Sequence, residues 1–599
     1  MLLNLQSLPR IVKGKKLPLR GLIRLRSLVR SNEFMLIPLA LVIGCAAGAA
    51  VAAMSGAAQL AHVVIYGIPL DVRLSAHEAV NVVAALAAPA AGGLVLGWME
   101  WSRRKLKISN ATDPIEANAL RGGNLSLRDS LVVSTQTLIS NGCGASVGLE
   151  AGYTQLGAGA ASVLGRALNL RRNDLRLMVG CGAAGAISAA FNAPLTGAFY
   201  ACELVVGRYS IGFAGPILVA AISAALLAGR LGGSPYSINV PEVSAPDIPA
   251  YGALILLALV VSVIGIVVMR SASTFERVFT RKWLPVWLRP VLGGVVIGSM
   301  AIGTPQVLAA GHGAMLLDLH REMPALLILT LIILKLCACL ISLASGFRGG
   351  LFFASLFVGS LVGKLYVIVL ALPMISFSFD PTTAALVGMA TLGVAIVGGP
   401  LTMSFLVLEM TRSLEVTAGV LAASIVTSVL VRAFFGHSFS TWRLHLRGET
   451  IRSADDIGWL RSLTVDSMMR TDVAIVMGTA TVADCRQKYP LGSHRALFVE
   501  DGTGYRGTVV LAEAFSSDID ESVKETSIVE LLKAPDVMLV RGMNVKAAMK
   551  AFDRAEIDIL PIVDNLLDRK VIGFLTESYA RRRYIEELDR ATGTVLTIN

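Results

Sequence analysis

Charged residues are scarce in this chain of 599 residues: only 16% are Asp, Glu, Lys or Arg, whereas 54% are hydrophobic. Soluble domains usually carry about 25% charged residues, so the composition argues against a cytosolic enzyme. Acids are scarcest in the first 450 positions, which hold 19 of the 42 acids but 34 of the 53 basic residues. This basic excess is typical of loops that face an anionic cytoplasmic leaflet, and we expect no nucleic-acid partner.

Cysteine is sparse as well. The seven cysteines fall mostly in apolar runs and form no CxxC pair, so neither a zinc site nor a disulfide framework is expected. The seven histidines are scattered without ligand spacing, and no nucleophile–base pair stands out. The sequence therefore predicts no metal, no cofactor in the apolar part and no enzymatic activity.

Long apolar segments fill residues 34–446. The first two, at about 34–65 and 79–101, are long enough to cross ~30 Å of hydrocarbon, and a basic cluster follows the second. The first 30 residues carry eight Lys or Arg and no acid, so residues 1–33 are expected to form an amphipathic helix on the membrane surface. We predict a multi-pass protein of the cell inner membrane with both termini in the cytoplasm.

The apolar part contains a duplicated unit. Residues 194–203 and 400–409 both begin Pro-Leu-Thr and place Glu nine residues after the proline. Upstream, Gly148 matches Gly350 at nearly the same separation. Many later apolar segments are short and broken by Gly or Pro, which is typical of transporters built from inverted repeats. The expected repeats are about 110–231 and 310–436.

The composition changes after Arg447. A linker is expected at 447–462 and a soluble α/β domain at 463–599. Within that domain, about 463–520 and 527–585 share the order β-α-β-β-α. The sequence therefore predicts a second internal repeat.

Glu150 is the strongest local signal. It lies in the Gly-rich stretch 142–152, where an apolar run is interrupted and a helix is expected to open. An ionisable residue at such a break indicates a functional site, and a helix start favours an anion or a carboxylate that takes its place. The alternative is a helix cap that faces water.

The segment Gly350-Leu-Phe-Phe-Ala354 occupies the equivalent position in the second repeat, with Phe352 in place of Glu150. Bare backbone N–H groups there suit a permanent anion site, and ordinary helix packing at small residues is the alternative. Asn110-Ala-Thr-Asp-Pro114 is expected to form an Asx-type turn that opens a short helix.

Glu203 and Glu409 lie late in apolar helices, one in each repeat. Such a symmetric pair could carry protons, or it could hold structural contacts to backbone or Arg. The spacing leaves both possibilities open.

The order of Asn-Ala-Thr-Asp-Pro, Gly-Leu-Glu-Ala-Gly, Phe-Asn-Ala-Pro-Leu, Gly-Gly-Leu-Phe-Phe-Ala and Leu-Glu-Met-Thr resembles the CLC chloride channel and transporter family. The last 135 residues resemble the paired CBS domains that many members carry. The resemblance implies an all-α polytopic membrane protein with an inverted internal repeat and a C-terminal cytoplasmic α/β CBS pair. It also implies a homodimer in the bilayer, in which each subunit has its own anion pathway.

The resemblance assigns roles to individual residues. Glu150 falls on the gating glutamate of the family. Three family residues are missing: a serine falls on Ala111, a tyrosine on Ser440, and the inner proton-relay glutamate on Leu204, with Glu203 as its acidic neighbour. The residues expected to bind the anion are Gly148, Leu149, Ala151, Gly350, Leu351, Phe352, Phe353, Ala111 and Ser440.

These features predict membrane transport of chloride or a similar small inorganic anion, gated by Glu150. A proton-coupled antiporter is the main alternative. A CBS-regulated cation channel would need acidic rings around a pore, and a membrane enzyme would need catalytic groups. In the tail, Gly573-Phe-Leu-Thr576 is followed by Tyr579 where adenosine-nucleotide sensors have Asp, so an adenosine nucleotide and a simple dimer contact both remain open.

Overall fold

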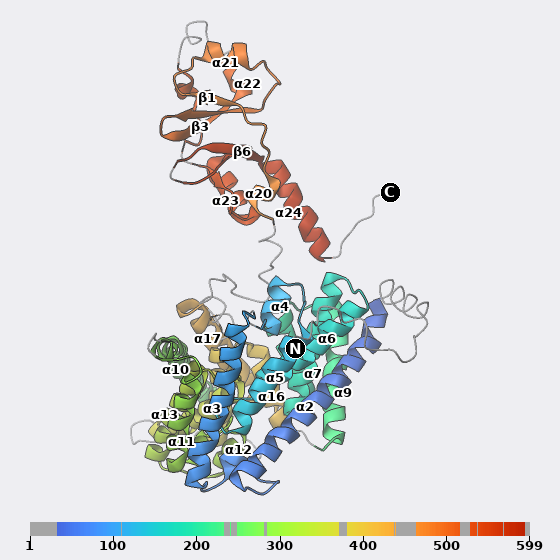
Figure 1. Ribbon diagram of the computed structural model, residues 1–599, viewed down its shortest axis with the longest axis vertical. Coiled ribbons are helices and arrows are strands. Elements are labelled where there is room, and N and C mark those ends of the chain that lie inside the picture. The colour runs from blue at the N-terminus through green and yellow to red at the C-terminus, as the bar shows by residue number, and fades with distance from the viewer. Residues whose placement is uncertain are drawn as a thin grey trace. The chain divides into compact units, whose positions relative to one another are not determined.

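The computed structural model describes residues 33–108, 111–232, 240, 248–280, 284–370, 380–436, 438, 442, 463–515, 527–535, 537–566 and 568–592 (Figure 1). The chain divides into two compact units, Met1–Asp456 and Ile457–Asn599. The expected surface helix 1–33, apart from its last residue, and the expected linker 447–462 lie outside the described residues. Ser440 lies outside them too.

The first unit is helical. Its elements are η1 (Glu33–Met35), α2 (Leu36–Tyr66), η2 (Leu74–Ala76), α3 (Val82–Lys105), α4 (Pro114–Leu120), α5 (Leu127–Gly142), α6 (Glu150–Ala167), α7 (Arg172–Phe191), α8 (Pro194–Tyr200), η3 (Ala201–Val206), α9 (Ile211–Arg230), α10 (Ile248–Phe279), α11 (Arg289–Gly303), η4 (Pro305–Val307), α12 (His312–His320), α13 (Ala325–Ser345), α14 (Phe352–Leu370), α15 (Pro381–Val397), α16 (Pro400–Thr411) and α17 (Leu414–Phe434). In Figure 1, α2 packs along α7 and α9, and α3 packs along α11.

Within the described residues, eight helices are long and apolar enough to cross a membrane, namely α2, α3, α7, α9, α10, α13, α14 and α17. Shorter apolar helices lie at Pro194–Val206, Arg289–Gly303, Pro381–Val397 and Pro400–Thr411. The predicted polytopic helical membrane fold, with its broken helices, is confirmed.

Polar caps fix where several helices begin. The Asp113 side chain accepts a hydrogen bond from Ile115 N at 2.8 Å and starts α4. Ser126 caps α5, and Asp380 caps α15 through the N–H groups of its first turn. A side-chain oxygen at this position satisfies an N–H that has no acceptor inside the helix. The short helix expected after Asn110 is confirmed.

The two repeats pack their helices in the same way. A methyl group on Gly157 of α6 would lie 2.4 Å from the carbonyl oxygen of Gly182 on α7. In the second repeat, a methyl group on Gly359 of α14 would lie 2.3 Å from the carbonyl oxygen of Gly388 on α15. Only glycine allows the backbones to approach so closely, so each repeat uses glycine at its central helix crossing.

Equivalent residues of the two repeats meet each other. Gly148 and Gly350 pair as an antiparallel bridge. The rings of Phe199 and Phe405 stack, with centroids 4.1 Å apart and planes 9° apart. A two-fold axis brings equivalent residues together in antiparallel fashion, so the units predicted from the letters are related by an approximate two-fold axis, as an inverted repeat requires.

The second unit holds two three-stranded sheets, ordered β1-β2-β3 and β4-β5-β6. In each sheet the first two strands pair parallel and the last two antiparallel, as the predicted β-α-β-β-α repeat requires. The elements are α20 (Val465–Met468), β1 (Ile475–Met477), α21 (Val482–Lys488), β2 (Ala496–Asp501), β3 (Gly504–Val510), α22 (Leu511–Ala514), η6 (Ile528–Leu531), β4 (Leu539–Val540), α23 (Val545–Ala555), β5 (Ile559–Val563), β6 (Val571–Thr576) and α24 (Glu577–Thr592).

Candidate functional site

Two helices from different repeats begin at one place. Gly148 N donates to Gly350 O at 3.0 Å, and Gly350 N donates to Gly148 O at 3.2 Å. Two residues after each glycine, α6 begins at Glu150 and α14 at Phe352. The first-turn N–H groups of a helix have no acceptor inside it and carry partial positive charge. The bridge therefore brings together two sources of positive potential that favour an anion.

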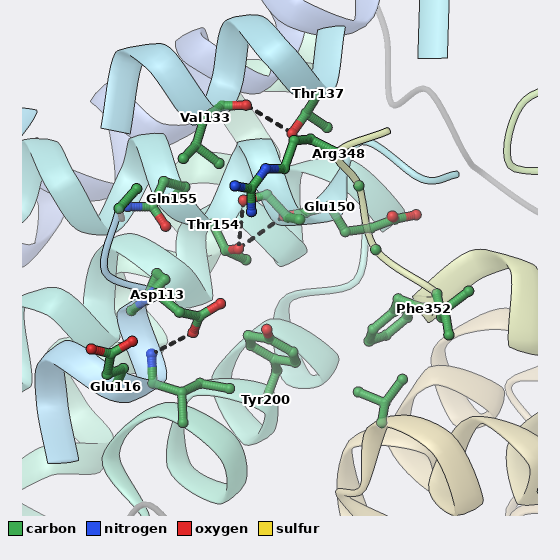
Figure 2. Close-up of a pocket in the computed structure, with 18 of the residues that line it drawn as sticks. Asp113, Glu116, Val133, Thr137, Glu150, Thr154, Gln155, Tyr200, Arg348 and Phe352 are labelled. Carbon is green, nitrogen blue, oxygen red and sulfur yellow. Dashed lines mark hydrogen bonds between the residues drawn. The ribbon is translucent and has the colours of Figure 1, made fainter. Parts of the chain in front are cut away.

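A cavity of about 160 Å³ lies at these helix starts (Figure 2). It also contains the α4 start, at Asp113 and Pro114, and Tyr200 of α8. The predicted site residues that line it are Ala111, Glu150, Ala151, Gly350, Leu351 and Phe352. The fold thus gathers residues that lie up to 241 positions apart in the sequence.

The side chain of Glu150 is buried in an unusual setting. The residue is 3% exposed, and neither carboxylate oxygen has a hydrogen-bond partner among the described residues. A methyl group on Gly148 would lie 1.8 Å from Oε2, so the carboxylate covers that glycine. Nε2 of His312 lies 3.9 Å from Oε1. Because the side chain is buried, the alternative of a cap that faces water is wrong.

The remaining predicted anion ligands occupy other positions. The backbone N–H groups of Gly148 and Gly350 donate to one another, which leaves the next amides along each chain for a ligand. Leu149 is buried in the apolar core, and the Phe353 ring lies against His312, with centroids 3.6 Å apart. Anion binding by these residues stays a prediction.

Glu203 and Glu409 cap helices of the opposite repeat. Glu203 accepts from Leu401 N at 3.0 Å and from Thr402 N and Oγ1 at 2.8 and 2.6 Å, at the start of α16. Glu409 accepts from Leu195 N at 2.8 Å and from Thr196 N and Oγ1 at 2.9 and 2.6 Å, at the start of α8. Of the two alternatives for this pair, structural contacts to backbone are therefore present.

Glu203 and Leu204 line a different cavity from the one beside Glu150. That cavity measures about 510 Å³ and includes Gly398, Gly399 and Ser438. A proton-relay role for Glu203 or for the position of Leu204 stays a prediction.

Sequence reasoning missed two residues, Arg348 and His312. Arg348 lines the cavity beside Glu150, and His312 contacts the Glu150 carboxylate from the start of α12. Arg348 is an ionisable residue in a Gly-rich break of an apolar run. The criterion that singled out Glu150 would also have found it. No sequence signal ties His312 to Glu150, because α12 reaches it only through tertiary packing.

The tail has a basic cavity of its own, of about 630 Å³, between residues of its two repeats. Arg470, His494 and Arg495 line it from the first repeat, and Tyr579 and Arg582 from α24. Guanidinium groups beside an aromatic ring suit a phosphorylated ligand with a flat base.

Comparison with known proteins identifies the family. Residues 87–432 match the family model described as voltage gated chloride channel. The chain is 32% identical over 358 residues to a putative chloride channel protein ClcB-like of Ralstonia nicotianae, in an alignment that covers 58% of this chain and 83% of that protein. Two solved structures share the fold. One is a slow cyanobacterial Cl-/H+ antiporter, with a TM-score of 0.59, 22% identity and coverage of 69% of this chain and 97% of that one. The other is a eukaryotic CLC transporter, with a TM-score of 0.57, 15% identity and coverage of 93% and 98%. Because the family model spans more than half of the chain and both helix starts that form the cavity, the chain belongs to the voltage gated chloride channel family.

Proposed function

We propose that Glu150 gates the pathway through which this membrane protein transports chloride or a similar small inorganic anion. One observation carries the proposal: a buried carboxylate, without a hydrogen-bond partner in the described chain, lies where α6 and α14 begin. An uncompensated buried charge is costly, whereas two helix starts favour negative charge at this place. The carboxylate and a permeant anion therefore compete for it.

Gating follows from this competition. While Glu150 is ionised, its carboxylate occupies the positive region and excludes the anion. Protonation removes the charge, the side chain swings away, and the amides of Leu351 and Phe352 take the anion at the start of α14. Transport needs no covalent chemistry, since the helix starts supply positive potential to the passing ion.

A further question is whether anion flux is coupled to proton movement. A solved structure of similar fold is a Cl-/H+ antiporter, which keeps exchange open. In this chain, however, Leu204 stands where the inner relay acid is expected, and three hydrogen bonds hold Glu203 on α16. We therefore favour uncoupled or weakly coupled flux. Uphill proton movement at a fixed ratio, driven by a chloride gradient across liposomes, would overturn this.

Substitution of Glu150 by Gln tests the gate. Glu150→Gln keeps the size of the side chain and mimics its protonated form. Anion efflux from liposomes should rise in the parent between pH 7.5 and about pH 4.5, where a carboxyl group protonates. The variant should conduct at both values with most of this dependence lost. Glu203→Gln, which lies outside the cavity, is the matched control and should keep the response. If Glu150→Gln retains the full pH response, the gate is elsewhere.

We also propose a homodimer in the inner membrane with both termini in the cytoplasm. The basic residues Arg103, Arg104 and Lys105 that end α3 support this orientation. Cysteine labelling at residue 105 and in the tail should be blocked in intact cells and allowed in inside-out vesicles. Detergent-solubilised protein should elute from a sizing column with the mass of two copies of the chain.

A second proposal concerns the tail, whose basic cavity suits an adenosine nucleotide. Its three arginines and Tyr579 support binding of phosphates and base. Titration of the full-length protein with ATP should give saturable heat that Arg495→Gln weakens, and Arg541→Gln, a tail arginine outside this cavity, should leave the heat unchanged. Equal heats of ATP binding for the parent and Arg495→Gln would contradict nucleotide binding in this cavity and favour a dimer contact as the role of the tail.

A further inference from the structure

His312 contacts the Glu150 carboxylate from outside the two bridged helix starts. Its Nε2 lies 3.9 Å from Glu150 Oε1, which is about 1 Å longer than a hydrogen bond. Both residues are buried, with 9% of His312 and 3% of Glu150 exposed. An imidazole offers a hydrogen-bond donor to a carboxylate as the neutral Nε2–H tautomer as well as the protonated cation. Because little water competes in a buried setting, such a donor attracts an ionised carboxylate more strongly there than in water.

The start of α12 fixes the imidazole beside Glu150. The N–H groups of Gly313 and Ala314, in the first turn of this helix, donate to Ser75 Oγ at 3.1 and 3.2 Å. The His312 ring lies against the Phe353 ring, with centroids 3.6 Å apart. The helix start and the ring are thus each held by a contact of their own, and the carboxylate is a further neighbour of the same ring.

A buried lysine anchors the segment that leads into α12. Lys335 Nζ donates to the four carbonyl oxygens of residues 306–309, at distances from 2.8 to 3.4 Å. Ala309 N in turn donates to Gly144 O at 3.1 Å, in the Gly-rich stretch that leads into α6. Backbone contacts therefore connect the segment before α12 with the segment before α6, so that the two side chains keep their relative position.

Other charged and titratable groups face this pair. On the side of His312 they are Arg73, Lys335 and His62. In the cavity beside Glu150 they are Tyr200, Arg348, Asp113 and Glu116. Burial and the nearby basic groups disfavour a positive charge on the imidazole, so the neutral ring acts on the carboxylate. None of these groups is altered by a substitution at position 312, so a difference between such variants reports the imidazole.

We propose that His312 is a positioning residue of the gate, which holds the ionised Glu150 carboxylate in the closed position and thereby sets the pH at which anions pass. While Glu150 is ionised, attraction to the imidazole N–H adds to that of the helix starts. Protonation of the carboxyl group removes the negative charge and weakens this attraction. Without the imidazole, the ionised closed state is less stable relative to the protonated open state, so opening occurs at a higher pH. This inference rests on the proposed gate at Glu150.

Two substitutions of similar volume separate the donor from the packing. His312→Leu removes the N–H group, whereas His312→Gln keeps an N–H donor of similar reach. The matched control is His320→Leu, because His320 lies exposed at the other end of α12, where its Nδ1 contacts Leu316 O at 2.9 Å. Each substitution is also made together with Glu150→Gln. Chloride efflux from liposomes is measured in steps from pH 4.5 to 7.5, and thermal unfolding is measured in parallel.

The pH of half-maximal efflux is the decisive readout, because a merely structural role would lower the unfolding temperature without changing it. His312→Leu should raise this pH by about one unit, which equals about tenfold more efflux at pH values above the parent's midpoint. His312→Gln and His320→Leu should keep the parent's midpoint. Together with Glu150→Gln, His312→Leu should change the pH dependence no further, since the carboxylate that it acts on is gone.

Four outcomes overturn the inference: an unchanged midpoint in His312→Leu, an equal shift in His312→Gln, an equal shift in His320→Leu, or a shift that persists together with Glu150→Gln. If His312→Leu fails to fold, His312→Phe decides in its place, because it keeps a ring against Phe353 and lacks the donor. Failure of the proposed gate is distinguishable, since Glu150→Gln alone would then keep the parent's pH response.

Discussion

The two membrane repeats share a scaffold and differ where the anion is expected to pass. Both cross their central helices at glycine, and each supplies a glutamate that caps a helix of the other. At the start of the next helix the first repeat has Glu150 and the second has Phe352. The two repeats have equivalent residues where backbone packing depends on them, and different residues where the helices begin at the cavity. This difference separates the residues that build the fold from those that can serve transport.

The three glutamates of the membrane unit differ in the hydrogen bonds that they accept. Glu203 and Glu409 each accept three hydrogen bonds from N–H and hydroxyl groups. Glu150 accepts none from the described residues, although it is the most buried of the three. A satisfied buried carboxylate stabilises structure, whereas an unsatisfied one is ready to move or to take up a proton.

Removal of either reciprocal glutamate cap should destabilise the membrane unit strongly. Glu203→Ala and Glu409→Ala each remove three charge-assisted hydrogen bonds and leave buried N–H groups without an acceptor, which costs about 3 kcal/mol or more in each case. Thermal unfolding in detergent should show equal losses for both variants. A loss confined to one variant would show that the two caps are not equivalent, despite their matching geometry.

The two glycines of the Gly148–Gly350 bridge differ in their distance from the Glu150 carboxylate. A methyl group on Gly148 would lie 1.8 Å from Glu150 Oε2, whereas one on Gly350 would lie 3.4 Å from the same atom. Gly148→Ala should therefore displace the carboxylate from the helix starts and raise anion efflux at pH 7.5 up to about tenfold, on the scale of the interaction between a charge and a helix start. Gly350→Ala should change efflux little. Equal efflux from the two variants would contradict the position of the closed gate.

The two repeats of the tail cap their equivalent helices with different residues. The equivalent helices α21 and α23 begin at Thr481 and Asn544, which accept hydrogen bonds from Asp484 N and Ala547 N. Thr481→Ala and Asn544→Ala should each cost about 1 kcal/mol. Hydrogen exchange of the full-length protein should locate each loss in its own helix. Loss of protection throughout the tail from either variant would show that the two repeats unfold as one.

A small effect is expected in how the stability of α21 and α23 depends on pH. Hydrogen bonds from Thr481 N–H and its hydroxyl lower the pKa of Asp484 below its ordinary value. A carboxyl group with a lowered pKa contributes stability above its unfolded pKa of about 3.9, and this contribution is lost as pH falls through the folded pKa. Protection of α21 relative to α23 should therefore fall below about pH 4, because Asn544 does not titrate. A constant ratio would contradict the assignment.

Much of the fold follows from local pattern. The lengths of the apolar runs predict the membrane helices, and the matched Pro-Leu-Thr and glycine spacings predict the repeat. Asp113 and the Gly-rich break before Glu150 mark helix starts because side-chain caps and glycine act within a few residues. The site was predictable where the same local rules apply, as at Glu150, Leu351 and Phe352.

The contacts of these residues could not be predicted in the same way. The caps that Glu203 and Glu409 make lie 198 or more positions away, and His312 reaches Glu150 across 162 positions of sequence. Such pairings depend on how the two repeats pack. The matching sequence positions of Glu203 and Glu409 leave open both a proton-carrying pair and a structural pair.

The amino-acid sequence was enough to predict which segments are apolar enough to enter the membrane, that the unit is duplicated, and which acid lies at a helix start. These properties depend on hydropathy, spacing and backbone conformation, all of which act locally. The packing of distant segments was needed to show that Gly148 pairs with Gly350 and that Arg348 lines the cavity. It was also needed to show that Glu150 is buried without a hydrogen bond, whereas Glu203 and Glu409 each accept three. Burial and electrostatic environment depend on which distant segments pack around a residue, and local sequence does not specify those segments.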